Sequence, residues 1–153
     1  MFLEKDDLKN NIYDYNLSQI TNDNDDIVNR ALAIAEQELK GYLTPNNKRE
    51  WNDGRIVFDV DVIFAKTGSD RNELLVGYGC TIAKWYIVDL CNSDMIYEQA
   101  KERYDRVKKD LRELRDGEFT PPDLEIKEPP ADEELEDGQE QFIYGSRAKF
   151  NHE

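Results

Sequence analysis

The stretch from Asn72 to Cys91 constrains the fold most, because its only charged residues are Glu73, Lys84 and Asp89. A helix that is apolar on nearly every side is typical of the buried centre of a domain. The same stretch is a poor membrane span, since Lys84 and two glycines interrupt it and its continuous apolar part is shorter than about 18 residues. We therefore expect one buried central helix and no membrane partner.

Two amphipathic helices are predicted beside it, over residues 27–43 and from 93 or 94 to 115, because their apolar residues recur at three- and four-residue steps. The first twenty residues add two shorter helical segments, each too short to be stable alone. A chain of 153 residues suits a single core. The predicted fold class is mainly α, a small bundle of four to five helices. The contacts expected between the central and last helices join Leu74, Ile82, Tyr86 and Leu90 to Ala100, Tyr104, Val107 and Leu111.

Residues 55–64 follow a different rule, since apolar side chains alternate with a period of two. This alternation predicts a strand or extended arm, within a wider arm segment 51–68. The chain offers no convincing strand to pair with it except the far C-terminus. An unpaired apolar strand is usually covered by another element or another chain. We therefore expect a subunit or partner interface on one side of the arm, formed by Ile56, Phe58, Val60, Val62 and Phe64.

The composition changes after the predicted helical domain 1–120. Residues 121–140 contain four prolines and a run of acids, and from 123 to 140 nine acids oppose Lys127 alone, which gives −8 of the total charge of −14. An acidic, proline-bearing linker is expected here. Residues 141–153 then return to apolar side chains, and Phe142, Ile143 and Tyr144 are predicted to dock onto a neighbouring subunit or partner.

No site for catalysis, a cofactor or a metal stands out. The single histidine, His152, lies next to the end of the chain, so a nucleophile would have no fixed base. Asp59 and Asp61 resemble a metal-holding carboxylate pair, but a metal needs further ligands, and the outer side of an alternating strand explains them better. Cys80 and Cys91 fit buried structural thiols. We expect no enzymatic activity, no cofactor and no stoichiometric metal.

The overall charge limits the partners. A net charge of −14 repels phosphate backbones, so sequence-specific DNA binding is not expected. The start of the chain is too acidic for an export signal, and its two cysteines are too far apart along one helix to bridge. Synthesis in a reducing cytoplasm is therefore predicted.

Several short pieces, in this order and spacing, resemble the small head-to-tail connector proteins of Mu-like tailed phages. The resemblance covers about residues 1–124 and depends on the following positions: Asp7-Leu8-Lys9, Ile27-Val28, Ala31, Ala35, Leu39, Tyr42-Leu43, Asp59-Val60-Asp61, Ile63-Phe64, Ala83, Tyr86, Leu90, Arg103-Tyr104, Leu111, Leu114 and Gly117. The long acidic extension departs from the usual pattern and resembles a longer subset that ends in Phe-x-x-Gly-Ser, here Phe142 to Ser146.

The resemblance implies a structural virion protein without catalytic residues. Such a protein would form a ring, expected to be dodecameric, beneath the portal protein in the neck of the virion, next to other neck or tail proteins, after synthesis in the cytoplasm of a bacterial host. Genomic DNA would pass through the ring, and an acidic channel wall would let it slide without sticking. The alternative is an acidic soluble binding module, such as a phage DNA mimic. A mimic should display carboxylates on its folded surface, whereas here more than half of the net charge lies in the linker.

Overall fold

A computed structural model describes residues 1–44, 56–91 and 96–127 of this chain. Its helices are the 3-10 helix η1 (Lys5–Asn10), α1 (Asp14–Thr21), α2 (Asp25–Leu43), α3 (Val60–Ala65), the 3-10 turn η2 (Gly68–Asp70), α4 (Glu73–Leu90) and α5 (Tyr97–Asp116). No strand occurs in these ranges. The prediction of a mainly helical bundle is thus confirmed.

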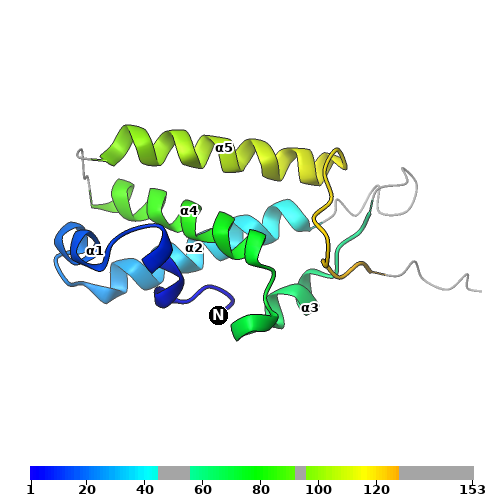
Figure 1. Cartoon of the computed structure of the whole chain (residues 1–153), viewed down its shortest axis with the longest axis horizontal. Helices are drawn as coiled ribbons and strands as arrows, with labels where there is room; N and C mark the ends of the chain where they lie inside the picture. The colour runs from blue at the N-terminus through cyan, green and yellow to red at the C-terminus, as the bar shows by residue number, and fades with distance from the viewer. Residues whose placement is uncertain (45–55, 92–95, 128–153) are drawn as a thin grey trace, which may run out of the picture.

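Helix α4 is the centre of the bundle, as its composition predicted. It lies between α2 and α5 and packs on both, while η1 and α1 cover one end of α2 and α4 and α3 lies toward the opposite end (Figure 1). The α4 side chains of Ile82, Ala83 and Ile87 are fully buried. Asn72 begins the helix, and its side-chain oxygen accepts hydrogen bonds from the backbone N–H groups of Leu74 and Leu75.

The two flanking helices use the faces that their periodicity predicted. Helix α2 begins at Asn24, whose side chain caps the N–H of Asp26, and ends just before the Thr44 C-cap. Helix α5 ends at Gly117, where a positive φ of 81° favours glycine. The buried residues of α2 are Val28, Ala31, Leu32, Ala35, Leu39 and Leu43, and those of α5 are Ala100, Val107, Leu111 and Leu114.

The seam between α4 and α5 is partly as predicted. Ile82 is buried and Tyr86 meets Tyr104 edge to face, with 6.2 Å between ring centroids. Leu74 and Leu90 are exposed instead, although both were expected in the seam. When a helix is apolar on nearly every side, its sequence does not indicate which face packs against which neighbouring helix. Tertiary packing therefore decides which of its leucines are buried.

The first residues of the chain enter the core. Phe2 and Leu3 are fully buried, and the methyl groups of Leu3 fill the space that Gly79 of α4 leaves open. A Cβ atom at Gly79 would lie 2.6 Å from Leu3 Cδ1. This close approach explains one of the two glycines in the central helix.

The strand predicted over 55–64 is wrong. Residues Val60–Ala65 form the short helix α3, capped by the side chain of Asp59, which accepts a hydrogen bond from the Val62 N–H at 3.2 Å. Only Phe58 pairs in an extended way, through one antiparallel bridge to Ile126. Buried residues come in adjacent pairs here, Val57 with Phe58 and Ile63 with Phe64, which an alternating strand with one buried face does not allow.

Candidate interface surface

The bridge between Phe58 and Ile126 lies in the segment 55–64 that the sequence predicted to form an interface. The N–H of Asp59 donates to the Glu125 carbonyl at 2.9 Å, and the N–H of Lys127 donates to the Val57 carbonyl at 2.7 Å. Within the described ranges, the N–H and carbonyl of Ile126 have no hydrogen-bond partner. In a bridge with this hydrogen-bond pattern both groups of Ile126 point away from Phe58, so the described residues leave one N–H and one carbonyl without a partner on this side.

The predicted interface residues separate into two groups. Ile56 and Val62 expose 43% and 46% of their surfaces. Phe58 and Phe64 are buried, and Val60 is half-buried against the core, so these three pack inside the subunit instead of forming one outward face. Phe142, Ile143 and Tyr144 lie outside the described residues.

Ile126 is a surface residue that the sequence reasoning missed. It is 54% exposed, although its neighbour Leu124 and the preceding Pro121 are buried. Residues 121–127 were predicted to belong to the linker, but they lie against the helical domain. Lone apolar residues among prolines and acids gave little sign of this packing. Ile56 and Ile126 lie on the two segments that the bridge joins, and Val62 lies on the adjoining helix α3; we call these three exposed residues the bridge patch.

An ion pair and an aromatic contact hold this surface to the bundle. Lys66 Nζ donates to Glu125 Oε1, which ties the end of α3 to the returning chain. That hydrogen bond holds the pKa of Glu125 below its ordinary value. Inside, the ring of Phe64 contacts that of Phe2 at 4.8 Å between centroids. The bridge patch therefore lies on a supported part of the subunit.

Phe2 is itself held by charged groups. Its N–H donates to Glu36 Oε2 at 2.7 Å, and its carbonyl accepts from Arg71 Nη1 at 2.7 Å. Arg71 also forms a bidentate pair with Asp7, with N–O distances of 2.6 and 2.8 Å. Burial raises the pKa of Asp7, but the hydrogen bonds from Arg71 and from the Glu4 N–H outweigh it, so this pKa lies below its ordinary value.

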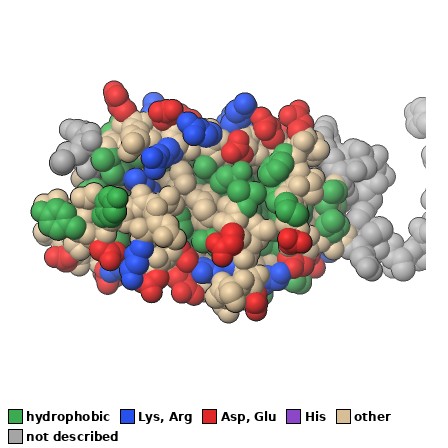
Figure 2. Space-filling model, viewed as in Figure 1, with side chains coloured by type: hydrophobic (Ala, Val, Ile, Leu, Met, Phe, Trp, Pro, Cys, Tyr) green, Lys and Arg blue, Asp and Glu red, His purple; other side chains and the backbone are tan. Residues whose placement is uncertain are grey.

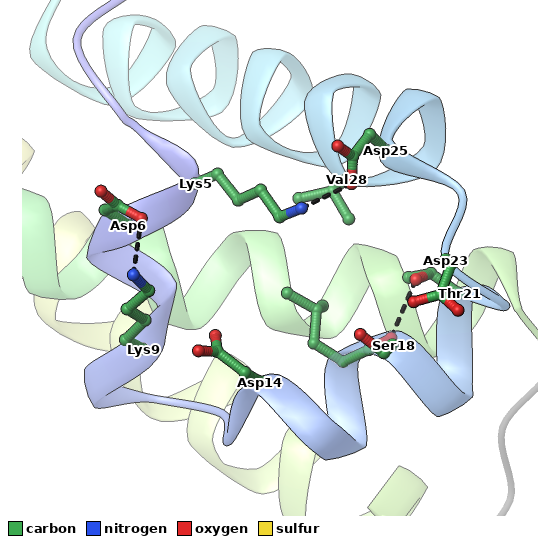
Figure 3. A pocket seen from close by; sticks show the side chains of 10 residues that line it. Lys5, Asp6, Lys9, Asp14, Ser18, Thr21, Asp23, Asp25 and Val28 are labelled. Carbon is green, nitrogen blue, oxygen red and sulfur yellow. Dashed lines mark hydrogen bonds and ion pairs between the residues drawn. The ribbon is translucent and has the colours of Figure 1, made fainter.

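The opposite end of the bundle contains a polar cavity of about 300 Å³ between η1, α1 and the start of α2 (Figure 3). Its charged side chains largely pair with one another: Lys5 Nζ lies 2.5 Å from Asp25 Oδ1, and Lys9 Nζ lies 2.9 Å from Asp6 Oδ1. No group of three or more metal-ligating side chains occurs in the part of the chain that the structure describes. The cavity resembles a solvated cleft between short helices.

The remaining reactive groups are held by structural contacts. Cys80 is buried, and burial raises the pKa of its thiol to about 12, so the thiolate is scarce at neutral pH. Lys84 is buried and its Nζ donates to the Asn11 carbonyl at 2.9 Å, at the end of η1. Tyr86 and Tyr104 both donate to the carboxylate of Glu38. Asp59 caps α3, as described above.

Comparison with known proteins adds no assignment: the chain matches no protein-family model, no curated protein and no solved structure. Among the described residues, no helix has the length and the apolar character needed to cross a membrane.

Proposed function

We propose that this chain is a structural virion protein, a head-to-tail connector that assembles as a ring at the portal or neck and forms part of the channel for genomic DNA. The bridge patch is the observation that carries the proposal. It combines exposed apolar side chains with a backbone N–H and a carbonyl that no described residue pairs, and such free groups are normally covered by another element or chain. A ring subunit needs a surface of this kind that meets a different surface on its neighbour.

Two further features support a connector. The order of short motifs over about residues 1–124 resembles the connectors of Mu-like phages, and a small helical bundle is the fold that this resemblance implies. Outside residues 123–140 the chain still carries a net charge of −6, which suits a channel wall that repels the phosphate backbone. The expected partners are further copies of the chain, the portal protein and neighbouring neck proteins.

The alternative, an acidic binding module such as a DNA mimic, has weaker support. A mimic needs a continuous acidic surface on its folded part. Helix α5, a long exposed helix of the bundle, carries seven cations against six acids and is thus formally +1. Figure 2 shows the cations and acids interleaved along the edge of the molecule that α5 forms.

The proposal is tested by the mass of the native assembly and by charge placed in the bridge patch. Mass measurement should give a closed ring, expected to contain twelve copies. Val62→Asp and Ile126→Asp should prevent ring assembly while the helical signal in circular dichroism is retained, because both side chains are exposed. Tyr13→Asp and Tyr15→Asp are matched controls, since these residues are 79% and 71% exposed at the start of α1, a helix at the other end of the bundle (Figure 1).

The outcomes separate the two functions. Rings that form normally with Asp at positions 62 and 126 would show that the interface lies elsewhere on the helices. A monomer that binds a DNA-processing enzyme with high affinity would favour the mimic instead.

A further inference from the structure

Helix α5 carries a row of cations that no acid of the described residues pairs. Three of its seven cations form ion pairs with neighbouring acids: Arg106 with Glu102, Lys109 with Glu113, and Arg115 with Asp116. In contrast, Lys101, Arg103, Lys108 and Arg112 form no ion pair with any described residue. By helix spacing, Arg103 lies on a different side of α5 from the other three.

These three cations share one face. They stand at positions i, i+7 and i+11, a spacing that places side chains one above another along a helix. We call them the basic edge. By helix spacing, Asp105 lies on the same side of α5, four residues after Lys101 and three before Lys108. Glu38 of α2 accepts hydrogen bonds from Tyr86 and Tyr104.

An aromatic cluster adjoins the basic edge toward the start of α5. The ring of Trp85 lies 5.1 Å from that of Tyr97 and is stacked 5.5 Å from that of Tyr104. Tyr97 is exposed, and Trp85 and Tyr104 are half-buried. Lys108 Nζ lies 5.0 Å above the ring of Tyr104, so the cationic and aromatic parts of the surface are continuous.

The chain beyond residue 127 has the complementary chemistry in the complementary order. Residues 128–140 contain seven acids and no cation, and the aromatic segment Phe142 to Tyr144 follows. A segment that runs back along α5 from its C-terminal end would meet Arg112 and Lys108 first, and then Tyr104, Lys101 and Tyr97. The two surfaces therefore match in charge, in apolar character and in direction.

The chain beyond Lys127 is longer than α5, and it starts from the bridge to Val57. The fourteen residues from 128 to 141 can span up to about 46 Å when extended, at about 3.3 Å for each residue. Helix α5 has 20 residues and is about 30 Å long. A tether of this size gives an effective concentration on the order of millimolar, so weak surface ion pairs suffice for binding.

We propose that residues 132–144 bind to the basic edge and the aromatic cluster of α5 in their own chain, before the subunit assembles. The acids pair with Lys101, Lys108 and Arg112, and Phe142 to Tyr144 cover the exposed part of Trp85 and Tyr97. This contact keeps the docking segment and the cationic row of the free subunit away from other partners. It does not depend on the ring: it concerns the isolated full-length chain.

Carbodiimide coupling of carboxylates to lysines tests the contact in the full-length protein. We expect cross-links from residues 132–140 to Lys101 and Lys108 at low salt, and their loss at 1 M salt, where the screening length is about 3 Å. Lys109 is the matched control, because it is exposed and equally close along the chain but lies off the edge and pairs with Glu113. Equal coupling to Lys108 and Lys109 would overturn the proposal.

A mixture of ¹⁵N-labelled and unlabelled chains identifies the source of the bound segment. Cross-links within one isotope class support binding in the same chain, whereas mixed-isotope cross-links would show exchange between copies and contradict it. A short DNA duplex is the third arm: protection of Lys101 and Lys108 by DNA, with no coupling to the chain's own acids, would assign the edge to nucleic acid instead.

Charge reversal supplies the second measurement. Lys101→Glu combined with Lys108→Glu should abolish the cross-links and shift the NMR signals of Phe142 to Tyr144. Arg106→Glu combined with Lys109→Glu, on the same helix, should leave both unchanged. If the first pair of substitutions leaves the signals of residues 142–144 where they were, the segment does not bind at the basic edge.

Discussion

Arg71 joins three separate segments through one guanidinium group. It donates to Asp7 of η1, to the carbonyl of Phe2 and, through Nε, to the carbonyl of Gly68. The side chains of Arg71 and Asp7 are almost buried, with 10% and 13% exposed. Asp7→Asn should therefore lower the free energy of unfolding by about 2 kcal/mol or more, because a nearly buried cation loses its charged partner. Urea unfolding at pH 7 measures this loss.

The carboxyl groups of Asp7 and Glu36 predict how the stability of the folded protein depends on pH. The pKa values of Asp7 and Glu36 are lowered in the folded protein, so the unfolded chain takes up these protons first as the pH falls. Their stabilising contribution is complete above about pH 5 and disappears as the pH falls through the folded pKa values. The difference in stability between wild type and Asp7→Asn should therefore narrow below about pH 4. A difference that stays constant from pH 7 to pH 3 would contradict this.

Gly79 and Gly77 offer a matched pair of substitutions in one helix. A Cβ at Gly79 would lie 2.6 and 2.7 Å from the Leu3 methyl carbons and 3.1 Å from Leu39 Cδ1, whereas a Cβ at Gly77 would meet nothing within 4 Å. Gly79→Ala should destabilise the protein by about 1 to 3 kcal/mol through overpacking. Gly77→Ala should stabilise it by roughly 0.5 to 1 kcal/mol through helix propensity. Thermal unfolding of both variants compares the two effects.

At the level of elements, the seam of α5 depends on its fully buried leucine. Leu111→Ala should cost about 2 to 5 kcal/mol in unfolding free energy, since the cavity it leaves is enclosed by the core. Leu90→Ala is the control on α4 and should cost much less, because Leu90 is 42% exposed. Equal losses in chemical unfolding would mean that α4 and α5 do not pack as described.

The long helices could be predicted from periodicity because each exceeds four turns and repeats its apolar spacing several times. Helix α3 could not, since six residues are less than two turns and its apolar letters also fit a period of two. The helix is favoured by the Asp59 cap and by the burial of Ile63 and Phe64, the second of which contacts Phe2. That burial is a tertiary contact between residues some 60 positions apart, which local patterns do not report.

The sequence likewise predicted only part of the candidate interface surface. Ile56 and Val62 were expected outside and are exposed there. Ile126 was missed because its exposure follows from the bridge to Phe58, a pairing across 68 residues. The basic edge was visible in the sequence only as a run of cations, because the ion pairs that leave Lys101, Lys108 and Arg112 without partners depend on side-chain geometry.

For the whole molecule, the boundary of the folded domain can be tested by truncation. Because Leu124 is buried and Glu125 to Lys127 pair with residues 57–59, deletion of 128–153 should leave a fully folded helical domain, while deletion of 125–153 should also lose stability. Neither truncated chain should assemble with its ring or partner if Phe142 to Tyr144 dock there. Normal incorporation of the 1–127 chain into particles would show that residues 128–153 are dispensable for assembly.

The packing of Leu3 against Gly79 also affects how the chain folds during its synthesis at the ribosome. Leu3 is synthesised 76 residues before Gly79, so the pocket that it fills exists only once α4 has been made. At 5 to 20 residues per second, this interval lasts roughly 4 to 15 s. During that time, Phe2 and Leu3 remain exposed on a nascent chain whose later segments cannot yet cover them. Phe2 and Leu3 therefore reach their buried positions only after α4 has been synthesised, so this part of the core forms late.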